Sequence, residues 1–174
     1  MFEKILVAMD SSGIGSHVFE QALSLAKALN VHLMLLHVLS PEEDNSPGLP
    51  GFSGVDYYPW SLNDVSISYR QQWDEFESEC LELLRSRTAE ASAAGVKAEF
   101  IQVPGSAGET VCNIAKNWEA DLIVIGHRGL SGLQELFLGS VSNYVLHHAP
   151  CSVLTVQSKV VTIPESAKAE GMES

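Results

Sequence analysis

The chain runs Asp121-Leu122-Ile123-Val124-Ile125-Gly126-His127-Arg128-Gly129 and, after nine intervening residues, continues as Gly139-Ser140-Val141-Ser142. The apolar run before Gly126 predicts a fully buried strand, and the pattern after Gly139 predicts an amphipathic helix. A strand therefore leads through a glycine-containing loop to the N-terminus of a helix. The free N–H groups and the positive dipole end of such a terminus can bind phosphate without any basic side chain.

Similar apolar runs recur along the chain and are separated by segments with helical spacing. The predicted strands are Ile5–Met9, Val31–Leu39, Val96–Val103, Leu122–Ile125 and Ser152–Val156. Strands that alternate with helices indicate a parallel sheet with helices on both faces. We therefore expect residues 1–157 to form one doubly wound, open, five-stranded α/β domain.

Two segments fall outside this alternating pattern. An irregular insertion, about residues 40–64, precedes a helix expected over Val65–Ala94 and contains four of the seven prolines. A loop of this length is either functional or disordered, and its aromatic residues could form a lid, a partner surface or simple packing. The tail, residues 158–174, offers little to bury, so we expect it to be flexible.

The charge balance limits the partners that the chain can have. There are 10 lysine and arginine residues against 22 aspartate and glutamate residues, a net charge of −12. This acidity opposes binding to nucleic acids and to anionic membranes. We therefore expect neither nucleic acid nor membrane as a partner.

Cysteine usage and the first residues indicate a reducing location. Cys80, Cys112 and Cys151 follow no C-x-x-C spacing, which favours free thiols and no metal site. The chain passes at once from Met1 into an apolar strand, and no apolar run approaches the ~20 residues of a membrane helix. These features predict a cytoplasmic protein.

Two polar clusters follow predicted strands and are candidates for one site. The segment Asp10–Ser16 follows the first strand, and residues 126–142 follow the fourth. If these strands are neighbours, both clusters face one crevice at the carboxyl end of the sheet, where α/β proteins bind ligands. Asp10 could then bridge a metal ion, or it could only cap the helix that follows. We expect no other carboxylate in this crevice and find no residue placed to activate water.

Several known nucleotide and hydrolase motifs are absent. The chain has no Gly-Lys-Ser/Thr of a P-loop, no G-x-G-x-x-G dinucleotide turn and no G-x-S-x-G nucleophile elbow. The segment Asp10–Gly15 approaches the phosphate loop of flavodoxins but differs from it at both ends. An FMN-binding electron carrier is therefore an alternative, although it leaves the second glycine cluster unexplained.

The glycine spacing G-x2-G-x9-G-[S/T] is met by Gly126, Gly129, Gly139 and Ser140. This pattern resembles the ATP-binding signature of the universal stress protein family. Three other segments resemble that family as well, namely Lys4–Ser12, Leu35–Val38 and Ala149–Leu154, so the resemblance covers roughly residues 3–157. Ala8 is a departure, because nucleotide-binding members often have proline there. The resemblance implies a Rossmann-like fold of the adenine nucleotide α-hydrolase type, with strand order 3-2-1-4-5.

The resemblance also implies a placement for ATP, accompanied by Mg²⁺ or Mn²⁺. Adenine would lie beside Val38 and the backbone near Ala8, and Asp10 would lie close to the ribose, the phosphates and the cation. The remaining contacts would come from Gly126 and Gly129 to the ribose and from Gly139, Ser140, Val141 and Ser142 to the phosphates. Arg128 could also reach a phosphate, for which its guanidinium is well suited, or could point to solvent. We expect His37, which lies in an apolar strand, to be a buried histidine with satisfied hydrogen bonds.

These features favour a regulatory ATP-binding protein of the universal stress type, with at most slow hydrolysis. A member of the same family that binds no nucleotide and acts only as a scaffold is a second alternative. In the strand order of that family the last strand, about residues 151–157, lies at a sheet edge and carries no charge. Such an edge is poorly protected against pairing, so we expect a homodimer formed through it.

Overall fold

The computed structural model describes residues 1–43, 45–48, 61–127 and 139–157. Its centre is a parallel five-stranded sheet with the order β3-β2-β1-β4-β5, which confirms the expected fold class. The strands are β1 (Lys4–Met9), β2 (His32–Leu39), β3 (Ala98–Pro104), β4 (Leu122–His127) and β5 (Ser152–Gln157). The tail lies outside the described residues.

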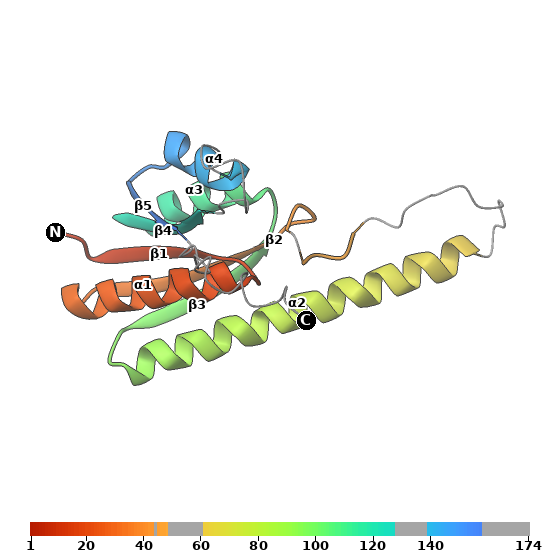
Figure 1. Cartoon of the computed structure of the whole chain (residues 1–174), viewed down its shortest axis with the longest axis horizontal. Coiled ribbons are helices and arrows are strands. Elements are labelled where there is room, and N and C mark those ends of the chain that lie inside the picture. Colours follow the sequence, from red (N-terminus) through yellow and green to blue (C-terminus); the bar gives the residue numbers. More distant parts are fainter. Residues whose placement is uncertain (44, 49–60, 128–138, 158–174) are drawn as a thin grey trace, which may run out of the picture.

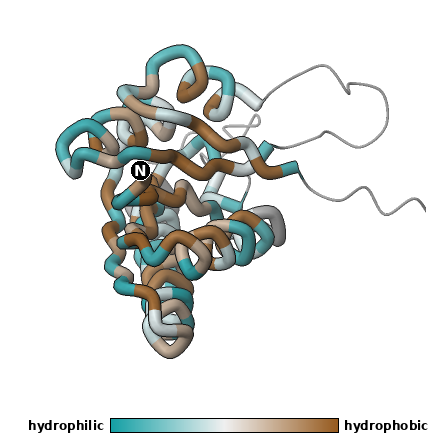
Figure 2. Tube along the Cα trace, turned by 90° about the vertical axis from the view of Figure 1, so that its left-hand side faces the viewer, coloured by the Kyte–Doolittle hydropathy of each residue, from teal (hydrophilic) through white to brown (hydrophobic). Residues whose placement is uncertain are grey.

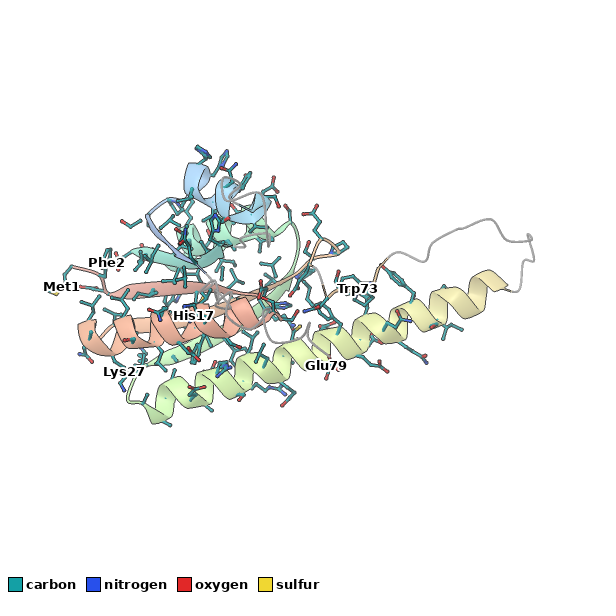
Figure 3. The ribbon with its side chains drawn as sticks, in the orientation of Figure 1. Met1, Phe2, His17, Lys27, Trp73 and Glu79 are labelled. Atoms are coloured by element: carbon teal, nitrogen blue, oxygen red, sulfur yellow. The ribbon has the colours of Figure 1, made fainter. Side chains whose placement is uncertain are left out.

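Helices cover both faces of the sheet (Figure 1). The helices are α1 (Gly13–Leu29), α2 (Ser61–Ala93), α3 (Ala107–Trp118) and α4 (Ser140–His148). Helices α1 and α2 lie on one face, and α3 and α4 lie on the other. Helix α2 begins at Ser61 rather than near Val65, so the last residues assigned to the insertion are helical. Its N-terminal part extends beyond the sheet, and Figure 3 shows Trp73 there.

Alternation along the strands divides the core into two layers. Ile5 and Val7 of β1 pack with α1 and α2, whereas Leu6 packs with α3 and α4. Because helices cover both faces of the sheet, both faces of the central strand β1 are buried, and its sequence is a nearly continuous apolar run. Figure 2 shows these hydrophobic residues along the strands, between the two helical layers.

A carboxylate joins the amino ends of β1 and β4, opposite the end at which these strands lead into loops and helices. Asp121 Oδ2 accepts hydrogen bonds from the backbone N–H groups of Glu3 at 2.8 Å and Lys4 at 2.9 Å. These two bonds lower the pKa of Asp121 below its ordinary value. The N–H of Asp121 in turn donates to the Lys4 carbonyl at 2.9 Å. Neighbouring strands β1 and β4 are thereby held in register.

No helix among the described residues is both long enough and apolar enough to span a membrane.

Candidate functional site

A cavity of about 240 Å³ opens at the carboxyl ends of β1 and β4. Ala8 of β1 pairs with Ile125 of β4, so the polar clusters that follow the two strands meet, as predicted. The predicted ligand-binding residues found in its wall are Ala8, Asp10, Val38, Gly126, Gly139, Ser140, Val141 and Ser142. Arg128 and Gly129 lie outside the described residues.

The strands give the cavity an apolar floor. Ala8, Leu36, Val38 and Ile125 contribute to it from three adjacent strands, and Val111 adds to it from α3. Side chains of this kind provide a surface for a flat aromatic ring, with polar groups at the rim to orient the rest of a ligand.

The N-terminus of α4 forms one polar wall. Gly139 is the N-cap residue, with φ −54° and ψ 152°, and no side chain caps the helix there. Asn143 N–H donates to the Gly139 carbonyl at 2.9 Å, which begins the helical ladder. The N–H groups of Ser140, Val141 and Ser142 therefore have no partner inside the helix and are suited to an anion.

The hydroxyl of Ser142 makes a hydrogen bond within this wall. Its side chain is buried, and its hydroxyl donates to the Gly139 carbonyl at 3.0 Å. In this structure the hydroxyl therefore stabilises the loop-to-helix junction. The group that Ser142 leaves for a ligand is therefore its backbone N–H.

Asp10 organises the opposite wall. Its Oδ1 accepts hydrogen bonds from Ser12 N–H at 3.0 Å, from the Ser12 hydroxyl and from Gly15 N–H at 3.1 Å. Asp10 thus caps α1, one of the two roles expected for it, while it also lines the cavity. A Cβ atom on Gly15 would lie 2.3 Å from the Asp10 carbonyl oxygen, so the close approach of turn and helix requires glycine.

The expectation that Asp10 is the sole carboxylate of the crevice is wrong. Glu42 and Glu43, which follow β2, also line the cavity. The side chain of Glu43 is only 8% exposed. Both residues follow the carboxyl end of a strand, as Asp10 does, and this position in the sequence is a signal for them although they lie in the irregular insertion.

Glu43 makes hydrogen bonds to two different segments. Its Oε1 accepts from Ser11 N–H at 2.8 Å and from the Ser11 hydroxyl at 2.9 Å. Its Oε2 lies 3.0 Å from His37 Nε2. Burial by itself raises the pKa of Glu43, but the hydrogen bonds from His37 and Ser11 outweigh it and leave the pKa below its ordinary value. His37, buried and hydrogen-bonded, matches its prediction.

The cysteines are free thiols set in the packing of the domain. Burial raises the pKa of Cys80 to about 12 and also raises the pKa values of Cys112 and Cys151. Thiols of this kind are weak nucleophiles. Within the described part of the chain, no three or more His, Cys, Asp or Glu side chains are grouped so that they could hold a metal ion.

Comparison with known proteins connects this geometry to a family. Residues 1–157 match the universal stress protein family. Universal stress protein Sll1388 of Synechocystis is 37% identical over 156 residues, which cover 90% of this chain and 98% of the relative.

Solved structures share the same fold. UspA from Lactobacillus plantarum has a TM-score of 0.67 and 24% identity, with 89% of this chain and 97% of that chain covered. A universal stress protein family protein from Arabidopsis thaliana, solved with AMP bound, has a TM-score of 0.59 and 22% identity, covering 94% of this chain and 96% of that chain. From the family match and the identity to its curated relative, we conclude that the chain belongs to the universal stress protein family.

Proposed function

We propose that this protein binds ATP in the cavity between β1 and β4 and acts as a regulatory stress-response protein that passes its nucleotide state to a partner protein. The observation that carries the proposal is the N-terminus of α4, without a side-chain cap, beside an apolar floor in one cavity. A polar anion site next to an apolar slot fits a nucleotide. The AMP-bound Arabidopsis protein of the same fold supports an adenine base.

In the proposed placement, adenine lies on Val38 and Ala8, ribose lies near Gly126, and phosphates lie against the backbone of residues 139–142. The charges of the cavity favour an orientation in which the phosphates lie at the N-terminus of α4. Asp10, Glu42 and Glu43 all line it and repel phosphate, whereas the dipole of α4 attracts it. A divalent cation would take oxygen ligands from the phosphates, with Asp10 as the candidate protein ligand.

Binding rather than turnover is the proposed activity. Asp10 accepts hydrogen bonds from Ser12 and Gly15, and Glu43 accepts them from Ser11 and lies against His37. Carboxylates held in this way serve as structural acceptors and are poorly placed to take a proton from water.

The same hydrogen bonds argue against an FMN-binding carrier. A flavodoxin-like phosphate would need the N–H groups at the start of α1. Those of Ser12 and Gly15 donate to Asp10, and that of Ser11 donates to Glu43. The anion position at this helix is therefore already taken by the protein's own carboxylates.

Calorimetric titration with ATP and Mg²⁺, together with chromatography of any ligand released from denatured protein, tests the proposal. We expect saturable 1:1 binding of ATP. The proposal would be refuted if no adenylate were released and no binding were detected at about millimolar ATP. Binding with a Kd in that range corresponds to a binding free energy of only ~4 kcal/mol.

A substitution at Gly139 tests the placement of the phosphates. Its φ and ψ suit a β-branched residue, and an added Cβ would meet the Ser142 hydroxyl at an ordinary 3.5 Å. Gly139→Val should therefore fold, but its methyl groups would fill space at the α4 terminus and abolish ATP binding. Gly48→Val is the matched control, because no atom of the described residues lies within 4 Å of a Cβ atom there. Equal ATP affinities for the Gly139 variant and the wild type would show that the phosphates lie elsewhere.

A further inference from the structure

Glu43 is a nearly buried carboxylate at the mouth of the cavity. It lies in the segment that follows β2, and its side chain is 8% exposed. A charge in such a position is stable only when hydrogen-bond donors surround it. The identity of those donors indicates what the residue does.

The tautomer of His37 can be assigned from its neighbours. The amide nitrogen of Gln102 lies 3.2 Å from His37 Nδ1 and also donates to the Glu77 carbonyl at 3.2 Å. Because an amide nitrogen can only donate, Nδ1 accepts, and the ring proton of a neutral His37 lies on Nε2. That proton then points to Glu43 Oε2, 3.0 Å away.

Ser11 supplies the other two donors, and it lies inside the turn that carries Asp10. Both its N–H and its hydroxyl donate to Glu43 Oε1, at 2.8 and 2.9 Å. The N–H groups of Ser12 and of Gly15, in the first turn of α1, donate hydrogen bonds to Asp10 Oδ1. Asp10 therefore holds the turn from within, and Glu43 holds it from a segment 32 residues away.

We propose that Glu43 is a positioning residue of the nucleotide cavity: it fixes the turn that carries Asp10 and ties that turn to β2 and to the segment after it. This inference rests on the proposed function, because the turn matters for binding only if the cavity takes a nucleotide. The carboxylate acts through Ser11, whose fixed backbone determines where Asp10 lies.

The test compares wild type with Glu43→Gln, which keeps the size of the side chain and removes its charge. The control is Glu75→Gln, which removes an exposed carboxylate on α2. Two quantities are measured at a temperature at which all three proteins are folded. One is ATP affinity by calorimetry, and the other is the hydrogen-exchange rate of the Ser11 amide in ligand-free protein, by NMR.

For Glu43→Gln we expect about tenfold weaker ATP binding, the size of one lost charged hydrogen bond, and at least about tenfold faster exchange at Ser11. The control should match wild type in both. Wild-type affinity or wild-type Ser11 exchange in Glu43→Gln overturns the proposal. If wild type itself binds no ATP, the proposed function fails. Unchanged exchange at the Ser11 amide in Glu43→Gln would separately refute the link from Glu43 to the turn.

Ser11→Ala provides a second variant in case Glu43→Gln does not fold. It removes one of the two donors of Ser11 and keeps the backbone bond, so we expect about threefold weaker ATP binding. In the double variant the two losses should not add, because both substitutions act on one interaction. Wild-type ATP affinity in the Ser11→Ala single variant would contradict the proposal, as would additive losses in the double variant.

Discussion

At the scale of single residues, Glu43 shows how burial and hydrogen bonding compete over one charge. Burial favours the protonated form, and hydrogen bonds from His37 and Ser11 favour the carboxylate. The other titratable groups around it are Cys80 on α2 and, in the wall of the same cavity, Asp10 and Glu42. Because the hydrogen bonds prevail, the folded state binds a proton at Glu43 less readily than the unfolded chain does.

This competition predicts a pH dependence of stability. The pKa of Glu43 in the folded state lies below its ordinary value of 4.5, so the stabilisation is complete above that pH and is lost as the pH falls through the lowered pKa. The difference in free energy of unfolding between wild type and Glu43→Gln should thus shrink between about pH 5 and pH 3. Urea titrations at several pH values measure it. A constant difference across this range would contradict the assigned direction.

At the scale of secondary-structure elements, α4 is positioned by close packing against α3. An added Cβ on Gly108 of α3 would lie 2.7 Å from Tyr144 Cδ1 of α4. The tyrosine ring also stacks on His148, with ring centroids 4.1 Å apart, so it has little room to move away. Gly108 therefore lets α4 approach closely enough to bring its N-terminus into the cavity wall.

Gly108→Ala should separate the two helices. We expect a loss of about 1–3 kcal/mol in the free energy of unfolding, typical of overpacking, and weaker ATP binding because the N-terminus of α4 shifts. Urea denaturation and calorimetry measure the two effects. Gly48→Ala, at a position with nothing near the new Cβ, should change neither. A Gly108→Ala protein as stable as wild type would show that the contact can relax without cost.

The elements themselves were largely predictable, and their ends were less so. The strands were found because buried parallel strands are short apolar runs. Val31 and Val96 were included in strands, yet each lies before its strand and donates its N–H to a helix carbonyl, Ala26 and Ala91 respectively. Their hydrogen bonds terminate α1 and α2, and the residues before them, Asn30 and Gly95, have positive φ.

The candidate site was only partly predictable, because only some of its residues belong to a local sequence pattern. Glycine spacing located the wall formed by α4, since backbone approach to a ligand constrains sequence strongly. The place of Glu43 after β2 can be read from the sequence, but its hydrogen bonds cannot, because its partner Ser11 is 32 residues away. Long-range pairs of polar side chains leave no local trace in a single sequence.

At the scale of the whole molecule, β5 is an edge strand, and no strand of the described residues pairs with its outer side. It lies at the end of the strand order, and its sequence Ser152–Gln157 carries no charge. Two large apolar side chains near this edge are exposed, one on each face of the sheet: Leu154 of β5, on the face that α1 covers, is 40% exposed, and Leu146 of α4, on the opposite face, is 43% exposed. An uncharged edge beside exposed leucines favours pairing with a second copy.

We therefore predict a homodimer formed through β5. Leu154→Lys should yield a monomer, because a charge would be buried at the pairing edge. Ile67→Lys is the control: Ile67 is 56% exposed on α2, which packs against β2 and β3 on the other side of the sheet. Light scattering at micromolar concentration measures the mass of each protein. A monomeric wild type, or a dimeric Leu154→Lys protein, would refute the assignment of the interface.

The carboxylate of Asp121, which joins β1 and β4, lies at the amino ends of these strands, and the cavity lies at their carboxyl ends. The link between the two strands and the lining of the cavity thus lie at opposite ends of the sheet. Substitutions in the loops around the cavity therefore leave the hydrogen bonds of Asp121 in place.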